Sequence, residues 1–391
     1  MTKMRRIWHL VFAGVSASAL LLSGCGTITT TGTPSTHAPS GLLPSGLPRT
    51  TVWTGYPVGT SNYAEQAAVA EALIDQRGSQ VRMIGSDTAM GRMTPLRTGQ
   101  AQVARLSDEA FYAFEGKHEF IGSDWGPQDL RTIWTPPTTV TVAVNADSGI
   151  TSLKDLKGKR IPWLSANPST QEKIQGILAY AGLTTDDIVK TPTQYSAQPK
   201  MLASGGLDMA IFGAQSAAII ETNMTRKVIW VDFDGDDAAL KRLQEYAPSV
   251  QLTEFESQIG MEGKAKRGPT YSIQMTSYAQ YSVEEVYETV KAFDELYGSY
   301  KDSTATTKDW GIDNIDWVPI VLPHHDGLVK YLKEKGIWTS AHEERNQLLV
   351  ERGEKLREGW KEVLEETPPD QLSEVWEAWK KENAPHPPLE N

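Results

Sequence analysis

The sequence predicts an α/β protein of two lobes followed by a helical C-terminal extension. Strand-like runs alternate with helical runs from residue 51 onward, which is the pattern of α/β domains with largely parallel sheets. A β-branched run at 138–144 separates two such units, and residues 51–391 are long enough for two domains. The segment 341–391 has a strongly helical pattern and is rich in charged residues.

The first 25 residues have the pattern of an export signal. Three basic residues precede position 7, residues 7–22 are largely apolar or small, and no acidic residue occurs before Cys25. The apolar stretch has the length of a signal-peptide core and is short for a membrane span. It ends in Leu-Ser-Gly-Cys, which resembles the bacterial lipobox and implies a signal peptide at 1–24 with a lipid on Cys25. The alternative is an ordinary secretory peptide with an incidental cysteine.

Residues 25–50 are expected to form the lipid anchor and a flexible linker. They are rich in Gly, Thr, Ser and Pro and show little apolar periodicity, so they cannot bury a core. A disordered processing remnant would have the same composition. We therefore expect a protein of the periplasm or cell surface that is held at the membrane by the lipid on Cys25.

The charge balance excludes two classes of partner. The formal net charge of the chain is −11, and removal of the three basic residues of the signal peptide makes it −14. A chain this acidic is not expected to bind nucleic acid or an anionic lipid surface. An anionic ligand would have to be held by local dipoles and hydrogen-bond donors.

The elements of the body follow in order. The first unit has a strand at 51–53, an apolar-faced helix through 67–74, a strand at 81–84, and a helix end, glycine cap and strand over 96–104. The second unit has a buried strand at 138–144, a strand at 161–164, a helix through 174–178, and a helix-to-strand junction at 206–212.

Extended crossovers are expected near 138–146 and 270–277. These positions assign 51–140 and 277–340 to lobe I and 141–276 to lobe II, with a helical C-terminal extension over 341–391. In the extension, Trp376 and Trp379 stand at helical spacing and are expected to anchor their helix onto the body.

Motifs of catalysis are missing from the sequence. It contains no HExxH, G-x-S-x-G, P-loop or dinucleotide-binding glycine pattern. His324 and His325 are adjacent, and adjacent side chains usually point apart, so a shared metal is not expected. We predict no enzyme, no cofactor and no bound metal.

Two loops have features of anion-binding sites. In 167–172, Ser169 and Glu172 match a capping box that would place Ser169 at a helix N-cap. Hydroxyls of Ser165, Ser169 and Thr170 and free N–H groups would then meet at the helix N-terminus, which attracts carboxylates and phosphates. The alternative is simply a well-capped helix.

The loop over 59–62 has the same construction. Thr60 and Ser61 supply hydroxyls, and Asn62 with Glu65 is expected to cap a helix that begins near Tyr63. In a third loop over 86–92, Arg92 could clamp a carboxylate in bidentate fashion, or it could be a surface arginine. One such helix N-terminus in each lobe would make a cleft for a small anionic molecule.

In this order, the loops resemble the TAXI family of solute receptors of tripartite ATP-independent periplasmic (TRAP) transporters. Asp147-Ser148-Gly149-Ile150 with 153–160 is similar to that family's D-S-G-I-x-S-x-x-D-L-K-G-K-R. The loop 167–170 occupies the place of its G-S-G-T loop, with Asn167-Pro168 in place of two residues. Further similar segments are found at 55–63, 96–101, 182–188, 205–215 and 318–336.

The resemblance implies a bilobal periplasmic-binding-protein (type II) fold that closes around a small carboxylate and delivers it to a TRAP-type permease. The carboxylate would be a dicarboxylate, an oxoacid, an acidic amino acid or an aromatic acid. Alternatives are the binding lipoprotein of an ABC importer and a periplasmic sensor for a membrane kinase. The expected ligand contacts are Thr60, Ser61, Asn62, Tyr63, Thr88, Arg92, Ser165, Asn167, Ser169, Thr170 and Gln215.

Overall fold

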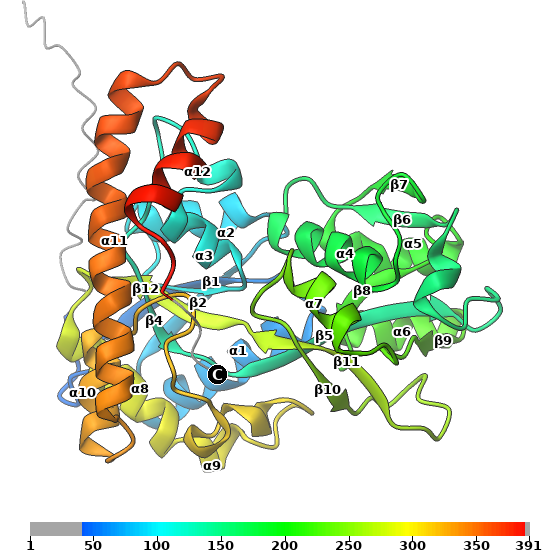
Figure 1. Ribbon diagram of the computed structural model, residues 1–391. Coiled ribbons are helices and arrows are strands. Elements are labelled where there is room, and N and C mark those ends of the chain that lie inside the picture. The colour runs from blue at the N-terminus through cyan, green and yellow to red at the C-terminus, as the bar shows by residue number, and fades with distance from the viewer. Residues whose placement is uncertain (1–40, 388–391) are drawn as a thin grey trace, which may run out of the picture. The chain divides into compact units, whose positions relative to one another are not determined.

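A computed structural model of the chain describes residues 41–387 (Figure 1). All of these residues belong to one compact unit of the chain. The signal peptide predicted at 1–24, the lipid site Cys25 and most of the predicted linker lie outside the described residues. Within the described part, no helix is long and apolar enough to cross a membrane.

Lobe I is built on a five-stranded sheet. The strand order is β2-β1-β3-β12-β4, with β2 and β3 both parallel to β1 and β12 antiparallel to its two neighbours. β-branched and aromatic residues such as Val52 and Trp53 suit the half-buried surface of such a sheet. The strands are β1 (Thr50–Gly55), β2 (Gln80–Gly85), β3 (Val103–Leu106), β4 (Leu130–Trp134) and β12 (Gln274–Tyr278).

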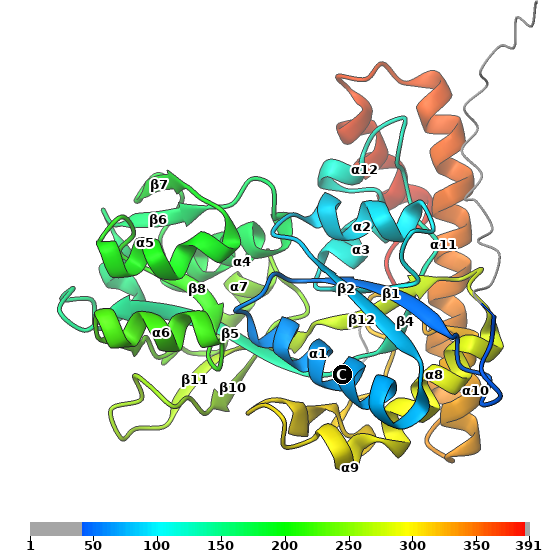
Figure 2. The ribbon, with the colours of Figure 1, turned by 180° about the vertical axis from the view of Figure 1, so that it is seen from behind.

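Helices cover both faces of this sheet. In Figures 1 and 2, α2 and α3 lie on one side of the strands and α1 and α8 on the other. The core of lobe I is rich in aromatic residues, with Trp53, Trp134 and Phe293 in edge-to-face contact. The helices are α1 (Ser61–Arg77), α2 (Ala89–Arg97), α3 (Glu109–Glu115), α8 (Val283–Glu295), α9 (Tyr297–Tyr300) and α10 (Asp326–Glu334).

Lobe II has its own sheets and its own apolar core. One sheet has the order β10-β11-β5-β8, with β9 also paired to β5, while β6 and β7 form a separate parallel pair. The strands are β5 (Pro137–Asn145), β6 (Arg160–Trp163), β7 (Val189–Pro192), β8 (Ala210–Gly213), β9 (Val228–Trp230), β10 (Gln251–Phe255) and β11 (Lys266–Ser272). The helices are α4 (Pro168–Tyr180), α5 (Gln198–Ser204), α6 (Ala217–Thr225) and α7 (Asp237–Gln244).

The chain crosses between the two lobes twice; the return falls within the predicted 270–277, and the outward crossing comes just before the predicted 138–146. β4 ends in the sheet of lobe I at Trp134, and β5 begins in that of lobe II at Pro137. On the return, β11 ends at Ser272 and β12 begins at Gln274. The run at 138–144 therefore lies wholly in lobe II, because β5 pairs with β11 from its first residue onward. The predicted division at residue 140 was placed too late for this reason.

The C-terminal extension packs on lobe I through α11 (Ser340–Glu366) and α12 (Leu372–Asn383) (Figure 1). Arg352 of α11 donates two hydrogen bonds to the buried carboxylate of Glu115, at 3.0 and 2.7 Å. Trp376 is fully buried, and its indole Nε1 donates to the carbonyl of Glu115 at 2.8 Å. Trp379 stacks on Trp376 with a centroid separation of 5.1 Å. The predicted anchoring role of these tryptophans is confirmed.

His324 and His325 have different partners. Nε2 of His324 lies 3.1 Å from the carbonyl of Trp317, whereas Nδ1 of His325 accepts from the N–H of Gly327 at 3.1 Å. Burial lowers the pKa of each imidazole to about 4. Within residues 41–387, no group of three or more His, Cys, Asp and Glu is placed to hold a metal ion.

Replacement of Trp376 by alanine is expected to destabilise the fold. The substitution removes a fully buried indole and leaves a cavity, which typically costs about 3–5 kcal/mol of unfolding free energy. Urea unfolding followed by tryptophan fluorescence measures the change. Val375→Ala is the matched control, because the neighbouring Val375 is 36% exposed and should lose little. Equal losses in both variants would contradict an anchoring role for Trp376.

Candidate functional site

The topology of lobe I indicates where a ligand would bind. β1 lies between β2 and β3, so the chain leaves β1 in one direction first and then returns to its other side. Open α/β sheets bind ligands at the carboxyl ends of the strands where the order reverses in this way. The loops at these ends carry Tyr56 after β1 and the run Ser107-Asp108-Glu109 after β3.

Helix N-termini of both lobes meet at the same place. The N–H of Ser61 at the start of α1 donates at 3.0 Å to the hydroxyl of Ser216, which stands at the N-cap position of α6. The N–H of Ala89 at the start of α2 donates to the carbonyl of Ala166 at 3.2 Å, just before α4. These contacts join lobe I to lobe II, so the lobes are closed on one another along this seam.

The helix caps differ from the prediction at both loops. Thr60, rather than Asn62, caps α1, and its hydroxyl accepts from the N–H of Tyr63 at 3.2 Å. Asn167, rather than Ser169, caps α4, and its Oδ1 accepts from the N–H of Thr170 at 3.3 Å. Pro168 explains the second shift, because proline fits the first helical position, where its missing N–H is not needed.

Seven of the predicted contact residues lie in the caps or first turns of α1, α2 and α4, and three of them (Ser61, Asn62 and Asn167) bond across the seam. Asn62 accepts at Oδ1 from the hydroxyl of Thr138 in lobe II at 3.3 Å, and Asn167 donates from Nδ2 to the carbonyl of Asp87 in lobe I at 3.3 Å. The hydroxyl of Thr88 caps α2 by accepting from Gly91. The seven residues are Thr60, Ser61, Asn62, Thr88, Asn167, Ser169 and Thr170.

Three predicted residues are placed less favourably for a contact at the seam. Ser165 is exposed and lies two residues before the N-cap Asn167. Gln215 is half-buried and donates to the carbonyl of Glu256 at 2.8 Å, within lobe II. Tyr63 is half-buried in the first turn of α1.

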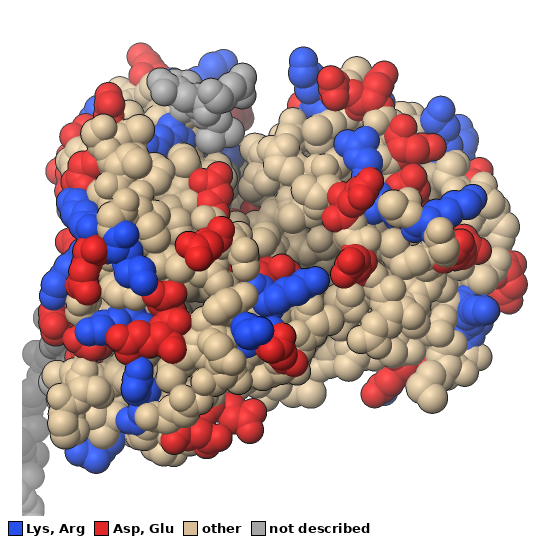
Figure 3. Space-filling view, turned by 90° about the horizontal axis from the view of Figure 1, so that it is seen from below, with Lys and Arg blue, Asp and Glu red and all other residues tan. Residues whose placement is uncertain are grey.

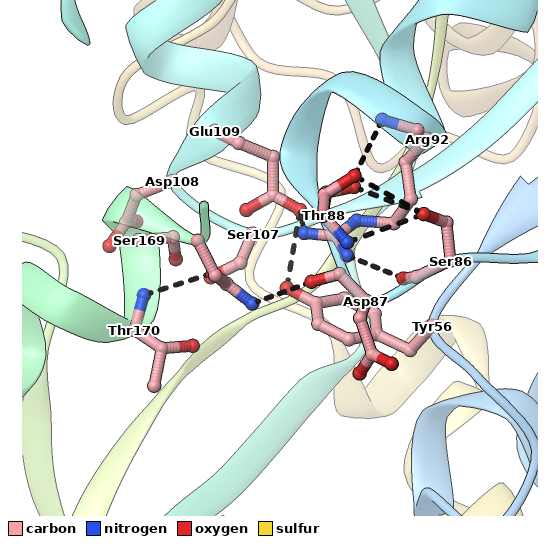
Figure 4. A network of polar contacts seen from close by, with 12 residues as sticks. Tyr56, Ser86, Asp87, Thr88, Arg92, Ser107, Asp108, Glu109, Ser169 and Thr170 are labelled. Carbon is pink, nitrogen blue, oxygen red and sulfur yellow. Dashed lines mark hydrogen bonds and ion pairs between the residues drawn. The ribbon is translucent and has the colours of Figure 1, made fainter. Parts of the chain in front are cut away.

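Arg92 has a different partner from the one predicted. It is fully buried, and its Nε and Nη2 donate to Oε1 of Glu109 in its own lobe at 3.0 and 2.8 Å (Figure 4). The hydroxyl of Tyr56 donates to the same oxygen at 3.2 Å. Burial acts to lower the pKa of Arg92, but the carboxylate of Glu109 raises it above its usual value. The alternative that Arg92 is a surface arginine is wrong, and its role as a ligand clamp stays a prediction; in this closed form its charge is balanced by Glu109 within lobe I.

A second cation of the cleft, Lys173, was missed by the sequence reasoning. It is 2% exposed on α4, and its Nζ forms an ion pair with Asp108 of lobe I. The same Nζ donates to the hydroxyls of Ser169 at 3.1 Å and Ser107 at 3.3 Å. Its spacing could have indicated this position in the sequence, because residue 173 lies one helical turn after Ser169 and therefore on the same face of the helix.

Two aspartates of lobe I accept hydrogen bonds from groups of lobe II. Asp87 accepts from the N–H and the hydroxyl of Ser196, both at 2.7 Å. Asp108 accepts from the hydroxyl of Ser249 at 3.0 Å in addition to its pair with Lys173. Each aspartate follows the carboxyl end of a strand, β2 or β3, and that position was the signal in the sequence.

Aromatic rings of both lobes pack against one another where the lobes meet. Tyr195 of lobe II stacks on Phe212 at 4.8 Å between centroids and meets Tyr56 of lobe I edge-on at 5.8 Å. All three side chains are buried in this closed form. Burial raises the pKa of Tyr56 and of Tyr271. The seam therefore combines hydrogen-bond donors, balanced charges and buried aromatic rings.

A cavity of about 1010 Å³ opens beside the hinge strands. Ser61, Thr138 and Gln215 line it together with Lys308 and four acidic residues, which are Glu65, Glu254, Glu256 and Asp309. Seen from below, the surface is hollowed between the lobes, and acidic and basic side chains are interspersed on both (Figure 3). This cavity adjoins the seam, since Ser61 and Thr138 belong to both.

The chain is similar in structure to several solute-binding proteins. It has 12% identity and a TM-score of 0.40 to the periplasmic aliphatic sulphonate binding protein SsuA of Escherichia coli, covering 79% of this chain and 88% of that one. It has 16% identity and a TM-score of 0.40 to the alkanesulfonate-binding protein SsuA of Xanthomonas axonopodis pv. citri, covering 86% of this chain and 92% of that one. It has 9% identity and a TM-score of 0.44 to a ligand-binding component of an ABC-type import system of Staphylococcus aureus, covering 74% of this chain and 92% of that one.

The two sheets, the double crossing and the seam of strand ends confirm the predicted bilobal, type II binding-protein fold. The sequence also matches the NMT1-like family over residues 52–336, a span that includes both lobes and excludes the C-terminal extension. A match of this extent shows the family, and the chain belongs to the NMT1-like family.

Proposed function

We propose that this chain is an extracytoplasmic solute-binding protein that captures a small acidic molecule between its lobes and delivers it to a membrane importer. The observation that carries the proposal is the convergence of helix N-termini from both lobes on one closed seam. Such termini present N–H groups and a partial positive charge to an anion. The buried Lys173 adds a full positive charge at the same seam.

The importer we propose first is of the ABC type. The family that matches the chain is the NMT1-like family, and this match does not by itself specify a TRAP permease. Bilobal receptors serve both kinds of transporter, so the fold itself does not separate them. A TRAP permease is the second candidate, and its support is the similarity of segments 147–160, 182–188 and 318–336 to TAXI receptors.

The location at the membrane is also part of the proposal. Cys25 follows a lipobox-like sequence and is the only cysteine of the chain. A lipid on this cysteine and a Gly/Ser/Thr/Pro-rich linker would keep the lobes close to the permease.

A thermal-shift screen of the chain with carboxylic acids is expected to find a stabilising ligand. A ligand at about 100 times its Kd adds roughly 2.7 kcal/mol to the stability of the form that binds it. The panel contains C4–C6 dicarboxylates, oxoacids, acidic amino acids and aromatic acids. Absence of any stabilising acid, with stabilisation by neutral or cationic solutes instead, would contradict the acidic ligand.

Joint replacement of Ser169 and Thr170 by alanine is expected to weaken binding of that ligand. Each lost hydrogen bond to a charged group costs about 1.5–3 kcal/mol, so the Kd measured by calorimetry should rise at least tenfold. Ser165→Ala is the matched control, because Ser165 is exposed and stands outside the seam. Unchanged affinity in the double variant would rule out the N-terminus of α4 as the anion site.

The source of energy for uptake separates the two transporter types. With an ABC importer, uptake of the labelled ligand by cells should stop on ATP depletion and persist after the ion gradient is collapsed. A TRAP permease predicts the reverse result. Cells that lack this chain serve as the control, and undiminished uptake in them would contradict a transport role.

Replacement of Cys25 by serine is expected to release the protein from the membrane. Each acyl CH₂ buried in the bilayer contributes about 0.8 kcal/mol, and all of that is lost without the thiol that carries the lipid. Labelled fatty acid should be incorporated into the native chain and not into the variant. Ser23→Ala, which keeps the lipobox pattern, should remain labelled and membrane-bound; loss of labelling there alone would contradict the lipobox interpretation.

A further inference from the structure

The two buried cations of the cleft differ in the lobe that supplies their partner. Arg92 and its partner Glu109 both belong to lobe I. Lys173 belongs to lobe II, and its partner Asp108 belongs to lobe I. Separation of the lobes therefore leaves the first pair intact and breaks the second. Among residues 41–387, Asp108 is the only carboxylate that forms an ion pair with Lys173.

The surroundings of Lys173 make a charged partner necessary in the closed form. The side chain is 3% exposed, and its Nζ lies 4.1 Å from the centroid of the Tyr271 ring. Its other hydrogen-bond partners are the hydroxyls of Ser107 and Ser169 and the carbonyl of Ser169, which are neutral. A buried ammonium that loses its counter-charge is strongly destabilising. The lobes can therefore close on Lys173 only when an anion accompanies it.

Asp108 supplies this anion at the expense of a local contact. It stands at the N-cap of α3, where an aspartate normally accepts a hydrogen bond from the first turn of the helix. Its side chain makes no such bond and instead contacts Lys173 and Ser249, both in lobe II. The carboxylate thus stabilises the closed arrangement of the lobes instead of its own helix.

We propose that Lys173 is the specificity-determining cation of the cleft and that Asp108 substitutes for the acidic group of the solute when no solute is bound. An incoming carboxylate takes the place of the Asp108 carboxylate on Lys173. A neutral solute that separates Asp108 from Lys173 would leave the ammonium of Lys173 without a counter-charge, so the closed form does not accept it. This inference rests on the proposed function in one respect, the location of the bound solute in the cleft.

Chemical rescue of Asp108→Ala tests the proposal without the natural ligand. Nitroxide labels at Lys157→Cys in lobe II and Lys361→Cys in the extension report the distance between the lobes in the full chain carrying Cys25→Ser. Both positions are exposed, and Cys25 is the only natural cysteine. We expect Asp108→Ala to shift the measured distance to longer values. Millimolar acetate, which fits the space left by the carboxylate, should return it to that of the native chain.

Three comparisons make the result specific to charge. Acetamide, which has the shape of acetate and no charge, should not restore the distance. Asp108→Ala combined with Lys173→Met should be closed with or without acetate, because no buried charge remains. Asp87→Ala removes another interlobe carboxylate, whose partners on Ser196 are neutral, so acetate should have little effect on it.

Two outcomes would overturn the proposal. Either Asp108→Ala remains closed in the absence of acetate, or acetamide restores closure as well as acetate does. Asp108→Asn guards against a folding defect, since it keeps the shape and the bond to Ser249 while it removes the charge. Failure of the rescue together with a stabilising acid in the thermal-shift screen would reject the role of Lys173 and leave the proposed function in place.

Discussion

Neutralisation of buried charge is the constraint on which the cleft depends. In lobe I, Arg92 of α2 and Glu109 of α3 are both fully buried and bonded to each other, and Tyr56 adds a hydroxyl to the same carboxylate. A second buried pair, Arg105 with Glu65, joins β3 to α1. Loss of one member of such a pair typically costs about 3–5 kcal/mol, because the other charge stays buried. These pairs fix the loops at the strand ends, so the face that lobe I presents to lobe II is rigid.

The contacts between the lobes are of another kind. They include the buried ion pair of Lys173 with Asp108, more exposed pairs such as Lys308 with Glu256 at 3.5 Å, several hydrogen bonds from neutral donors, and backbone contacts such as the N–H of Ala218 to the carbonyl of Gly59 at 3.1 Å. The two apolar cores are largely separate, although Tyr56 of lobe I packs into the core of lobe II. Within residues 41–387 the chain crosses between the lobes at 135–136 and at residue 273. Opening would therefore exchange a few polar contacts and the ring contact of Tyr56 with Tyr195 for water. That balance permits hinge motion between two states of similar free energy.

The fold was largely predictable because it follows from local patterns. The alternation of strands and helices and the glycines after α2 and α5 are properties of short segments, and Gly99 and Gly205 adopt the positive φ of such caps. The site was less predictable because it depends on partners that are distant in sequence. Arg92 was assigned to a ligand, since its pairing with Glu109 is set by the packing of α2 against α3. Lys173 was missed, because a lysine on a helix is exposed unless tertiary structure buries it.

The negative net charge of the chain is compatible with the proposed acidic ligand. A formal charge of −11 creates a repulsive field for an anion at a distance, but salt screens that field within about 8–10 Å at physiological ionic strength. Inside the seam, the charge of Lys173 is shielded from water and from the surface carboxylates. Exchange of the Asp108 carboxylate for that of a solute leaves the number of charges paired with Lys173 unchanged. Selection for an acid then rests on the counter-charge that closure requires, and the overall field of the protein has little part in it.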